Sequence, residues 1–169
     1  TPSIGLKVNQ NRRTSHKIMM GIDVMKEFGK NPVSVTGSPE ADKGLENTRL
    51  FRELTLYYGI ESSIGRWKIK GYAGMFPRYL SEGDYSKAFY SDSLKFYDNN
   101  LEGALIKAFG PKSFFELSFD WNGKYGSDRR EQFIVSSYGK HDFTDWFSLG
   151  YALKYHHYAN TANYGSVVD

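Results

Sequence analysis

Carboxylates are the residues of this sequence that most readily suggest catalysis, but their spacing argues against it. Glu116 and Asp120 stand four positions apart in a stretch of alternating polar and apolar residues. On one face of a β-strand this spacing separates them by about 13 Å, at about 3.3 Å per residue. The acid and base of a glycosidase lie closer together than this. We therefore interpret the two as charges that line an interior rather than as a catalytic pair.

Histidine and serine offer no stronger catalytic pattern. His156 and His157 are adjacent, so a strand would point their rings to opposite faces and they could not share a metal ion. His16 and His141 are distant in the sequence, and the chain has no cysteine. Gly-x-Ser-x-Gly, P-loop and Gly-x-Gly-x-x-Gly motifs are also missing from the sequence. The sequence thus predicts no catalytic residue, no metal and no cofactor.

A long segment rich in aromatic residues, 77–100, has the residue types of a binding loop. Such a loop can fold into the mouth of a barrel, narrow a pore or stack on a sugar ring. The alternative is an outer loop whose aromatic side chains bury one another. The candidate residues for a constriction or a ligand site are Arg78, Tyr79, Tyr85, Phe89, Tyr90, Phe96 and Tyr97.

The elements that would position these residues are β-strands, because apolar and polar residues alternate along most of the chain. About eight strands are predicted, over residues 4–9, 17–27, 50–61, 66–76, 101–109, 114–121, 130–140 and 146–158. Most have about 8 to 13 residues, whereas an ordinary globular strand has about 5–6. Strands of about 9–11 residues are typical of barrels that cross a membrane.

The connections between these strands alternate in length. Short links at 11–15, 62–65, 110–113 and 141–145 alternate with longer ones at 29–47, 77–100 and 122–129. Tight turns at one end and long loops at the other are typical of outer-membrane barrels. A soluble up-and-down barrel has no physical reason to separate its loop lengths in this way.

Composition excludes several other classes of protein. The 169 residues are 17% aromatic, and their net charge of +3 is not concentrated in a basic run, which argues against a nucleic-acid partner. Abundant aromatic residues argue against disorder. No stretch approaches the ~18–20 consecutive apolar residues of a membrane-spanning helix.

With aromatic residues at the strand ends, the chain resembles the bacterial outer-membrane β-barrel proteins in the broad, porin-like sense. These residues are Phe28, Trp67, Phe76, Phe109, Trp121, Trp146 and Tyr158. The resemblance implies an all-β, antiparallel, up-and-down transmembrane β-barrel, with residues 1–169 as a single barrel domain or barrel segment. It further implies membrane lipid as a partner, an outer-membrane location, and a non-enzymatic role as a channel or as the membrane component of a surface complex. Other outer-membrane or periplasmic proteins are the further partners that it implies.

Strand direction adds a second expectation. If the short turns are periplasmic, the chain starts and ends on the extracellular side, whereas complete barrels of this class start and end in the periplasm. We therefore expect an internal segment of a larger barrel. In the short turn at 11–15, Arg12 and Arg13 are either solvated charges or contacts for a periplasmic partner or for acidic lipid headgroups.

Alternation by itself does not say which face of the strands meets which solvent. In the membrane interpretation, the polar positions face the lumen. They are Lys7, Lys17, Asp23, Glu27, Glu53, Arg66, Lys68, Lys70, Glu102, Glu116, Asp120 and Lys154. The alternative is a soluble β-barrel that inverts the faces and binds a small apolar ligand or a carbohydrate. A third possibility, a membrane-embedded enzyme acting on lipids, is neither supported nor excluded by the sequence.

Overall fold

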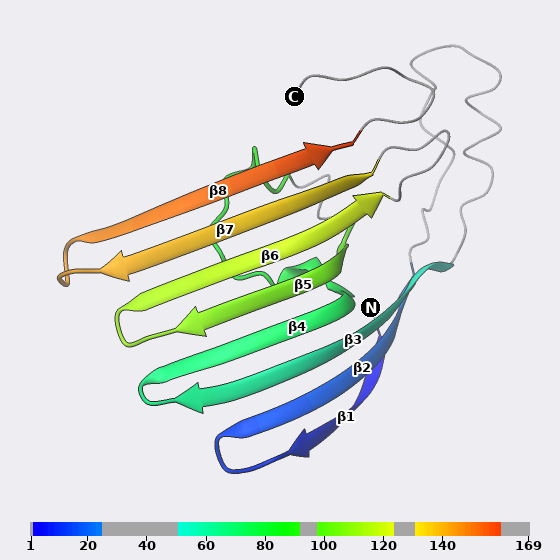
Figure 1. Ribbon diagram of the computed structural model, residues 1–169, viewed down its shortest axis with the longest axis horizontal. Helices are drawn as coiled ribbons and strands as arrows, with labels where there is room; N and C mark the ends of the chain where they lie inside the picture. The colour runs from blue at the N-terminus through cyan, green and yellow to red at the C-terminus, as the bar shows by residue number, and fades with distance from the viewer. Residues whose placement is uncertain (1, 25–50, 92–97, 124–130, 160–169) are drawn as a thin grey trace.

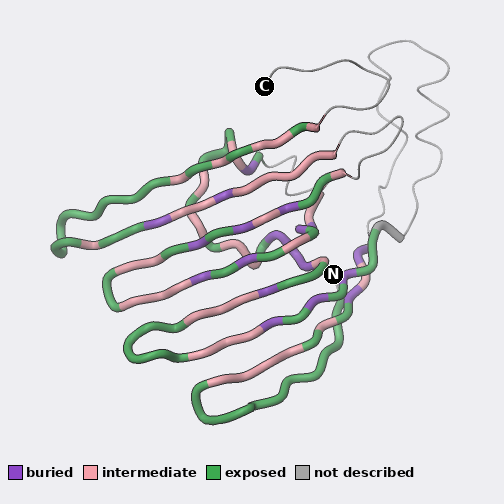
Figure 2. The backbone as a smooth tube through the Cα atoms, viewed as in Figure 1, coloured by how far each residue is buried: buried purple, intermediate pink, exposed green. Residues whose placement is uncertain are grey.

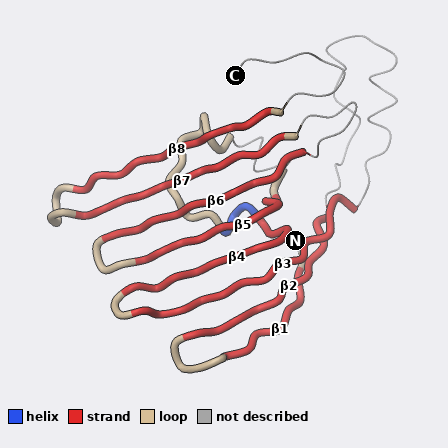
Figure 3. Tube along the Cα trace, in the orientation of Figure 1, coloured by secondary structure: helices blue, strands red, loops and turns tan. Residues whose placement is uncertain are grey.

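The computed structural model describes residues 2–24, 51–91, 98–123 and 131–159, and it is almost entirely β-structure (Figures 1 and 3). Its strands are β1 (Ser3–Asn9), β2 (Thr14–Val24), β3 (Phe51–Ile64), β4 (Trp67–Pro77), β5 (Asn100–Phe109), β6 (Ser113–Gly123), β7 (Gln132–Asp142) and β8 (Ser148–Tyr158). One short 3-10 helix, η1 (Arg78–Leu80), follows β4. The predicted strand content is therefore confirmed. Among the described residues, no helix has the length and apolar character needed to cross a membrane.

The eight strands form one sheet in the order β1-β2-β3-β4-β5-β6-β7-β8, and every neighbouring pair is antiparallel. The predicted antiparallel up-and-down topology is confirmed. The sheet is not closed, because β1 pairs only with β2 and β8 only with β7 in the described part of the chain. An open sheet of this kind is consistent with part of a barrel.

The two ends of the sheet differ in their connections. Short turns join β1 to β2, β3 to β4, β5 to β6 and β7 to β8 at one end, which lies at the left in Figure 1 and which we call the short-turn end. The strand ends that the other three connections join lie at the opposite end, which we call the long-loop end. The strand bounds agree with the predicted alternation of short and long connections, although residues 29–47 and 124–129 of the predicted long links lie outside the described residues.

The strand register gives the sheet two chemically different faces. One row of paired residues runs Leu6, Ile18, Tyr58, Ala73, Ala104, Phe119, Val135 and Tyr155 across all eight strands. Large apolar side chains on this side, which we call the apolar face, are strongly exposed, with Leu6 at 77% and Leu153 at 61%. The neighbouring positions of each strand point to the other side, the polar face.

The main cluster of buried apolar side chains lies on the polar face. Its members are Tyr57, Tyr72, Phe76, Leu101 and Leu105, with Leu80 of η1 packed against them. Buried positions accordingly gather on the central strands and around η1 (Figure 2). Among the described residues, the sheet thus buries its core on the polar face, beneath the segment that follows β4.

Candidate site on the polar face

The segment 78–91, which we call the inner loop, leaves β4 and runs along one face of the sheet, behind β5–β8 in the view of Figure 1. Charged side chains of three strands hold it there. Lys107 of β5 donates to the Leu80 carbonyl oxygen at 2.5 Å and pairs with Glu82. Lys154 of β8 donates to the Phe89 carbonyl oxygen at 3.1 Å. These contacts fix the inner loop at both of its ends.

Glu116 of β6 holds the middle of the loop through its backbone. Its carboxylate, which is 0% exposed, accepts hydrogen bonds from the N–H groups of Glu82 at 2.7 Å and Gly83 at 3.4 Å. A buried carboxylate that accepts backbone N–H groups is well compensated for its desolvation. Gly83 also lies so close to β7 that an added Cβ would stand 2.8 Å from the Cβ of Tyr138. The loop therefore needs glycine at this point of contact.

Arg78 anchors the start of the inner loop in a set of oxygen atoms. Its guanidinium donates to Asp120 at 2.6 Å, to the Asp98 carboxylate at 3.0 Å and to the Asn100 carbonyl oxygen at 2.8 Å. Burial opposes the charge of Arg78, but Asp120 and Asp98 outweigh it and raise the pKa of the guanidinium. Burial raises the pKa of Asp98, against the opposing effect of Arg78. The guanidinium of Arg78 thus directs its hydrogen bonds to groups inside the protein.

The second buried cation, Lys107, is matched by Glu82. Burial would raise the pKa of Glu82, but the hydrogen bond and charge of Lys107, followed by the charge of Lys70, lower it overall. Lys70 lies 3.8 Å from the same carboxylate. Because one carboxylate serves two ammonium groups, the ionised form of Glu82 is what holds this part of the loop to the sheet.

Aromatic rings fill the space between the inner loop and β7. The ring of Tyr85 lies 4.8 Å from that of Tyr90 and 5.7 Å from that of Tyr138, measured between centroids. Burial, followed by the charge of Glu116, raises the pKa of Tyr85, so its hydroxyl stays protonated. Beside these rings lies a pocket of about 360 Å³. It is lined by Pro77, Arg78, Tyr79, Ser81, Gly83, Tyr85, Tyr90 and Asn99.

The structure brings together four of the seven loop residues named from the sequence. Arg78, Tyr85 and Tyr90 lie against the polar face, and the Phe89 backbone is held by Lys154. Tyr79 borders the pocket with 75% of its surface exposed. Phe96 and Tyr97 lie outside the described residues.

Most of the polar positions predicted to face a lumen share the polar face. By register these are Lys7, Lys17, Asp23, Glu53, Lys68, Lys70, Glu116, Asp120 and Lys154. Arg66 lies in the turn between β3 and β4, and Glu27 lies outside the described residues. Glu116 and Asp120 hold different parts of the inner loop and do not meet as a pair.

Glu102 differs from the prediction, because the register pairs it with Met75 on the apolar face. Strand β5 carries apolar residues on both sides, with Leu105 on the polar face and Ile106 on the apolar face, so alternation could not assign its faces. Sequence reasoning also missed Lys107, which is 1% exposed and binds the inner loop. Lys107 is two residues from Leu105 and therefore lies on the same face of β5. The sequence could assign Lys107 to the polar face only if Leu105 were already known to lie there.

In the described part of the chain, no group of three or more histidine, aspartate or glutamate side chains is arranged to hold a metal ion. No protein-family model matches the sequence, no curated protein is significantly similar to it, and no solved structure resembles it significantly.

Proposed function

We propose that this protein is a non-enzymatic β-barrel of the bacterial outer membrane and acts as a porin-like channel. The eight strands would form part of the barrel wall, with the apolar face toward lipid and the polar face toward the lumen. The observation that carries the proposal is the one-sided exposure of large apolar side chains along the whole sheet, opposite a face that holds the buried charges and the inner loop.

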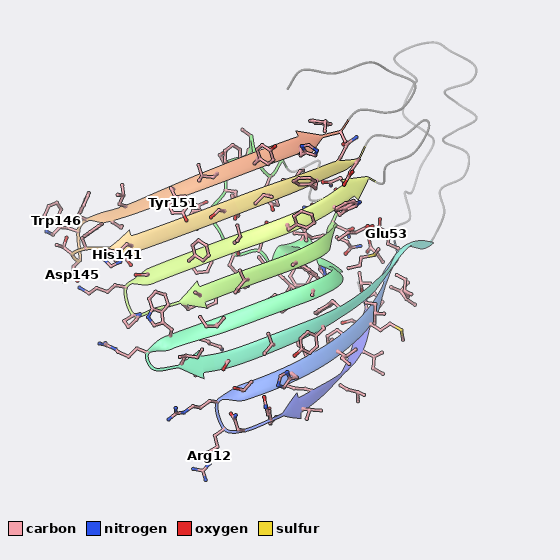
Figure 4. The ribbon with its side chains drawn as sticks, in the orientation of Figure 1. Arg12, Glu53, His141, Asp145, Trp146 and Tyr151 are labelled. Carbon is pink, nitrogen blue, oxygen red and sulfur yellow. The ribbon has the colours of Figure 1, made fainter. Side chains whose placement is uncertain are left out.

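The height of the apolar face supports this proposal. On β6–β8 it ends at the long-loop end in a group of contacting rings that includes Trp121, Phe133 and His157. At the short-turn end, His141 contacts Phe143, and Trp146 is 87% exposed next to Phe147 (Figure 4). Phe133 and His141 are eight residues apart on β7, which corresponds to about 26 Å. Tilted strands of known barrels cross the membrane in about 9–11 residues, and their lipid-facing bands lie between two aromatic girdles.

In the part of the chain that the structure describes, the outer edges of β1 and β8 pair with no further strand, and this sets a further condition. Lipid offers no hydrogen-bond partner, so a strand that faces it must be paired on both sides. The proposal therefore includes further strands that pair with β1 and β8 and close the ring.

The inner loop gives the proposed channel its shape. Because it lies across the polar face, it would narrow the lumen of a closed barrel, with Tyr79 and the 360 Å³ pocket facing the passage. Its ion pairs with Asp120 and Lys107 would keep that narrowing fixed. Solute passage would then depend on loop shape and on the charges along the wall.

The test is refolding of the full-length protein with and without detergent micelles, followed by conductance in planar bilayers. A membrane barrel is expected to gain strand circular dichroism only with detergent, to shift in gel mobility when boiled, and to give discrete conductance steps. A soluble monomer with strand signal in plain buffer would contradict the proposal and would favour the inverted barrel that binds an apolar ligand or a carbohydrate. A folded membrane protein without conductance would favour the membrane component of a surface complex.

A further inference from the structure

Two groups of cations on or beside the polar face differ in how they are neutralised. Arg78 and Lys107, beneath the inner loop, are buried and paired with carboxylates. A second group at the short-turn end of β1–β4 has far less negative charge around it. We call it the basic cluster, and it consists of Lys7, Arg12, Arg13, Lys17 and Lys68.

Strand pairing concentrates the positive charge of this cluster. The register places Lys7 of β1 directly opposite Lys17 of β2, and like charges in directly opposite positions destabilise a sheet. The Lys17 ammonium lies 5.0 Å from the ring centroid of Tyr72, so an aromatic face gives it partial compensation. Within the described residues, Lys7, Arg12 and Arg13 form no ion pair.

Four of these cations line one pocket of about 320 Å³. Glu61 is the single carboxylate among the lining residues, and it lies 3.4 Å from Lys68. Asparagine and serine side chains, including Asn9, Ser15 and Ser63, supply neutral hydrogen-bonding groups on the same wall. The pocket therefore combines surplus positive charge with neutral donors, which is the chemistry of an oxyanion site.

The turn that carries the two arginines is fixed by its own hydrogen bonds. The Asn11 side-chain oxygen accepts from the backbone N–H groups of Arg13 at 2.7 Å and Thr14 at 2.8 Å. The Thr14 hydroxyl lies 2.9 Å from that of Ser62, which ties β2 to β3 at this level. Arg12 and Arg13 thus project from an ordered turn rather than from a loose link.

The strand register shows on which face of the sheet the pocket lies, and therefore from which side an anion would enter it. Asn9, Ser15 and Glu61 are paired in one row, and Ser63 pairs with Lys68 in the next. Both rows belong to the polar face, so these residues place the pocket on the side of the proposed lumen. At the other end of the same face the charges are acidic, with Glu53, Asp98 and Asp120 around one pocket. Figure 4 shows Arg12 and Glu53 at opposite ends of the sheet.

We propose that the basic cluster is a binding site for small multivalent oxyanions, such as phosphate- or sulfate-bearing solutes, on the lumen side of the short-turn end. The inference rests on the proposed function in that a channel with this cluster at one mouth prefers anions to cations. Binding itself does not require conductance, because the four pocket-lining cations come from strands and turns of a single continuous sheet.

The test measures inorganic pyrophosphate binding to the full-length protein folded in detergent, by isothermal titration calorimetry. The variant carries Lys7→Gln, Arg12→Gln and Arg13→Gln, and Arg12→Gln alone is a milder second variant. The matched control is Lys112→Gln, which removes one positive charge from the β5–β6 turn, outside the cluster. Boiling-dependent gel mobility checks that each variant is folded.

The expected result is saturable pyrophosphate binding that weakens roughly tenfold or more in the triple variant, less in the single variant and not measurably in the control. Reversal potentials in a salt gradient should also show anion preference that the triple variant loses. Absent binding in the wild type, or equal binding in the triple variant, would overturn the site. Conductance without anion preference would overturn the channel part of this inference and leave the proposed function standing. Binding without conductance would support the site and reject the channel.

Discussion

The charges beneath the inner loop and the charges of the basic cluster share one face of one sheet but have different physical roles. Under the loop, Arg78, Lys107 and Glu116 are almost completely buried, and each one contacts a group of opposite polarity. In the basic cluster, Lys7, Arg12 and Arg13 are exposed and form no ion pair with described residues. Burial makes the difference, because a desolvated charge must be compensated inside the protein, whereas an exposed charge is free to meet a solute.

The comparison teaches which charges can be changed without loss of the structure. The buried charges attach the inner loop to the sheet, so removing them should lower the free energy of unfolding. Charges of the basic cluster should affect binding and selectivity while leaving the fold intact. The following experiments test this division and the division between the two faces, in order of decreasing effect.

Replacing Asp120 by alanine should give the largest loss of stability. It leaves the Arg78 guanidinium buried at 6% exposure without its closest carboxylate. Breaking a buried ion pair on one side typically costs about 3–5 kcal/mol. Urea unfolding of the detergent-folded protein measures the cost. The control is Asp142→Ala at the exposed pair with Lys140, which should change stability by less than about 1 kcal/mol. Similar effects at the two sites would contradict the division between buried and exposed charges.

Replacing Leu153 by arginine tests which face meets lipid. Leu153 lies in the middle of β8 on the apolar face and is 61% exposed. Arginine at the midplane of a membrane costs about 2–4 kcal/mol, and near the interface it costs about 0–1 kcal/mol. Leu149→Arg is therefore the matched control, because Leu149 lies on the same face near the end of the same strand and is equally exposed at 61%. If unfolding from lipid vesicles gave the same free energy for both variants, the apolar face would not be in the membrane.

Replacing Gly83 by valine tests the close contact between the inner loop and β7. An added Cβ would stand 2.8 Å from the Tyr138 Cβ, which neither residue can relieve by rotating a side chain. Overpacking of this kind typically costs about 1–3 kcal/mol. The displaced loop should be cleaved faster by an added protease, and channel conductance should rise. Ser86→Val, at an exposed position of the same loop, should do neither.

The smallest expected effect is a pH-dependent loosening of the inner loop. The pKa of Glu82 is lowered in the folded protein from its ordinary value of 4.5. The ionised group therefore contributes its full stabilisation above about pH 4.5 and loses it as the pH falls through the lowered pKa. Asp98 has a raised pKa and acts in the opposite direction, so the net change is modest. Protease cleavage of the loop as a function of pH measures it. Glu82→Gln should remove the acid-induced part, and an unchanged profile would contradict the assignment.

Alternation was enough to predict the strands and their order, because lipid or solvent on one side and charge on the other leave a period of two in the sequence. It correctly predicted that Lys68, Lys70 and Lys154 share one face of the sheet. It failed at β5, where Leu105 is buried beneath η1 and Ile106 is exposed on the opposite face. Both sides of that strand carry apolar residues, so the sequence pattern does not indicate which of them lies on the polar face.

The arrangement of the inner loop could be predicted only in part. Its aromatic content indicated a site, and Tyr85 and Tyr90 do pack together. The sequence did not indicate that Glu116 would bind backbone N–H groups of the loop, because such a contact depends on how the chain returns over strands that follow it. Contacts of this kind join residues 27 to 65 positions apart, beyond the reach of local patterns.

Strand order has a consequence for how the protein acquires its structure. Each strand pairs only with its neighbours in the chain, so the wall can grow by adding one hairpin after another, each closed by a short turn. The inner loop is made early in the chain, but Lys154, which holds Phe89, lies on the last strand, 65 positions later. The contacts with Lys107 and Glu116 become available once β5 and β6 are in place, whereas the contact at Phe89 must wait until β8 has joined the sheet. An assembling chain would therefore attach the start and middle of the loop first, and fixing of its far end would mark the completion of these eight strands.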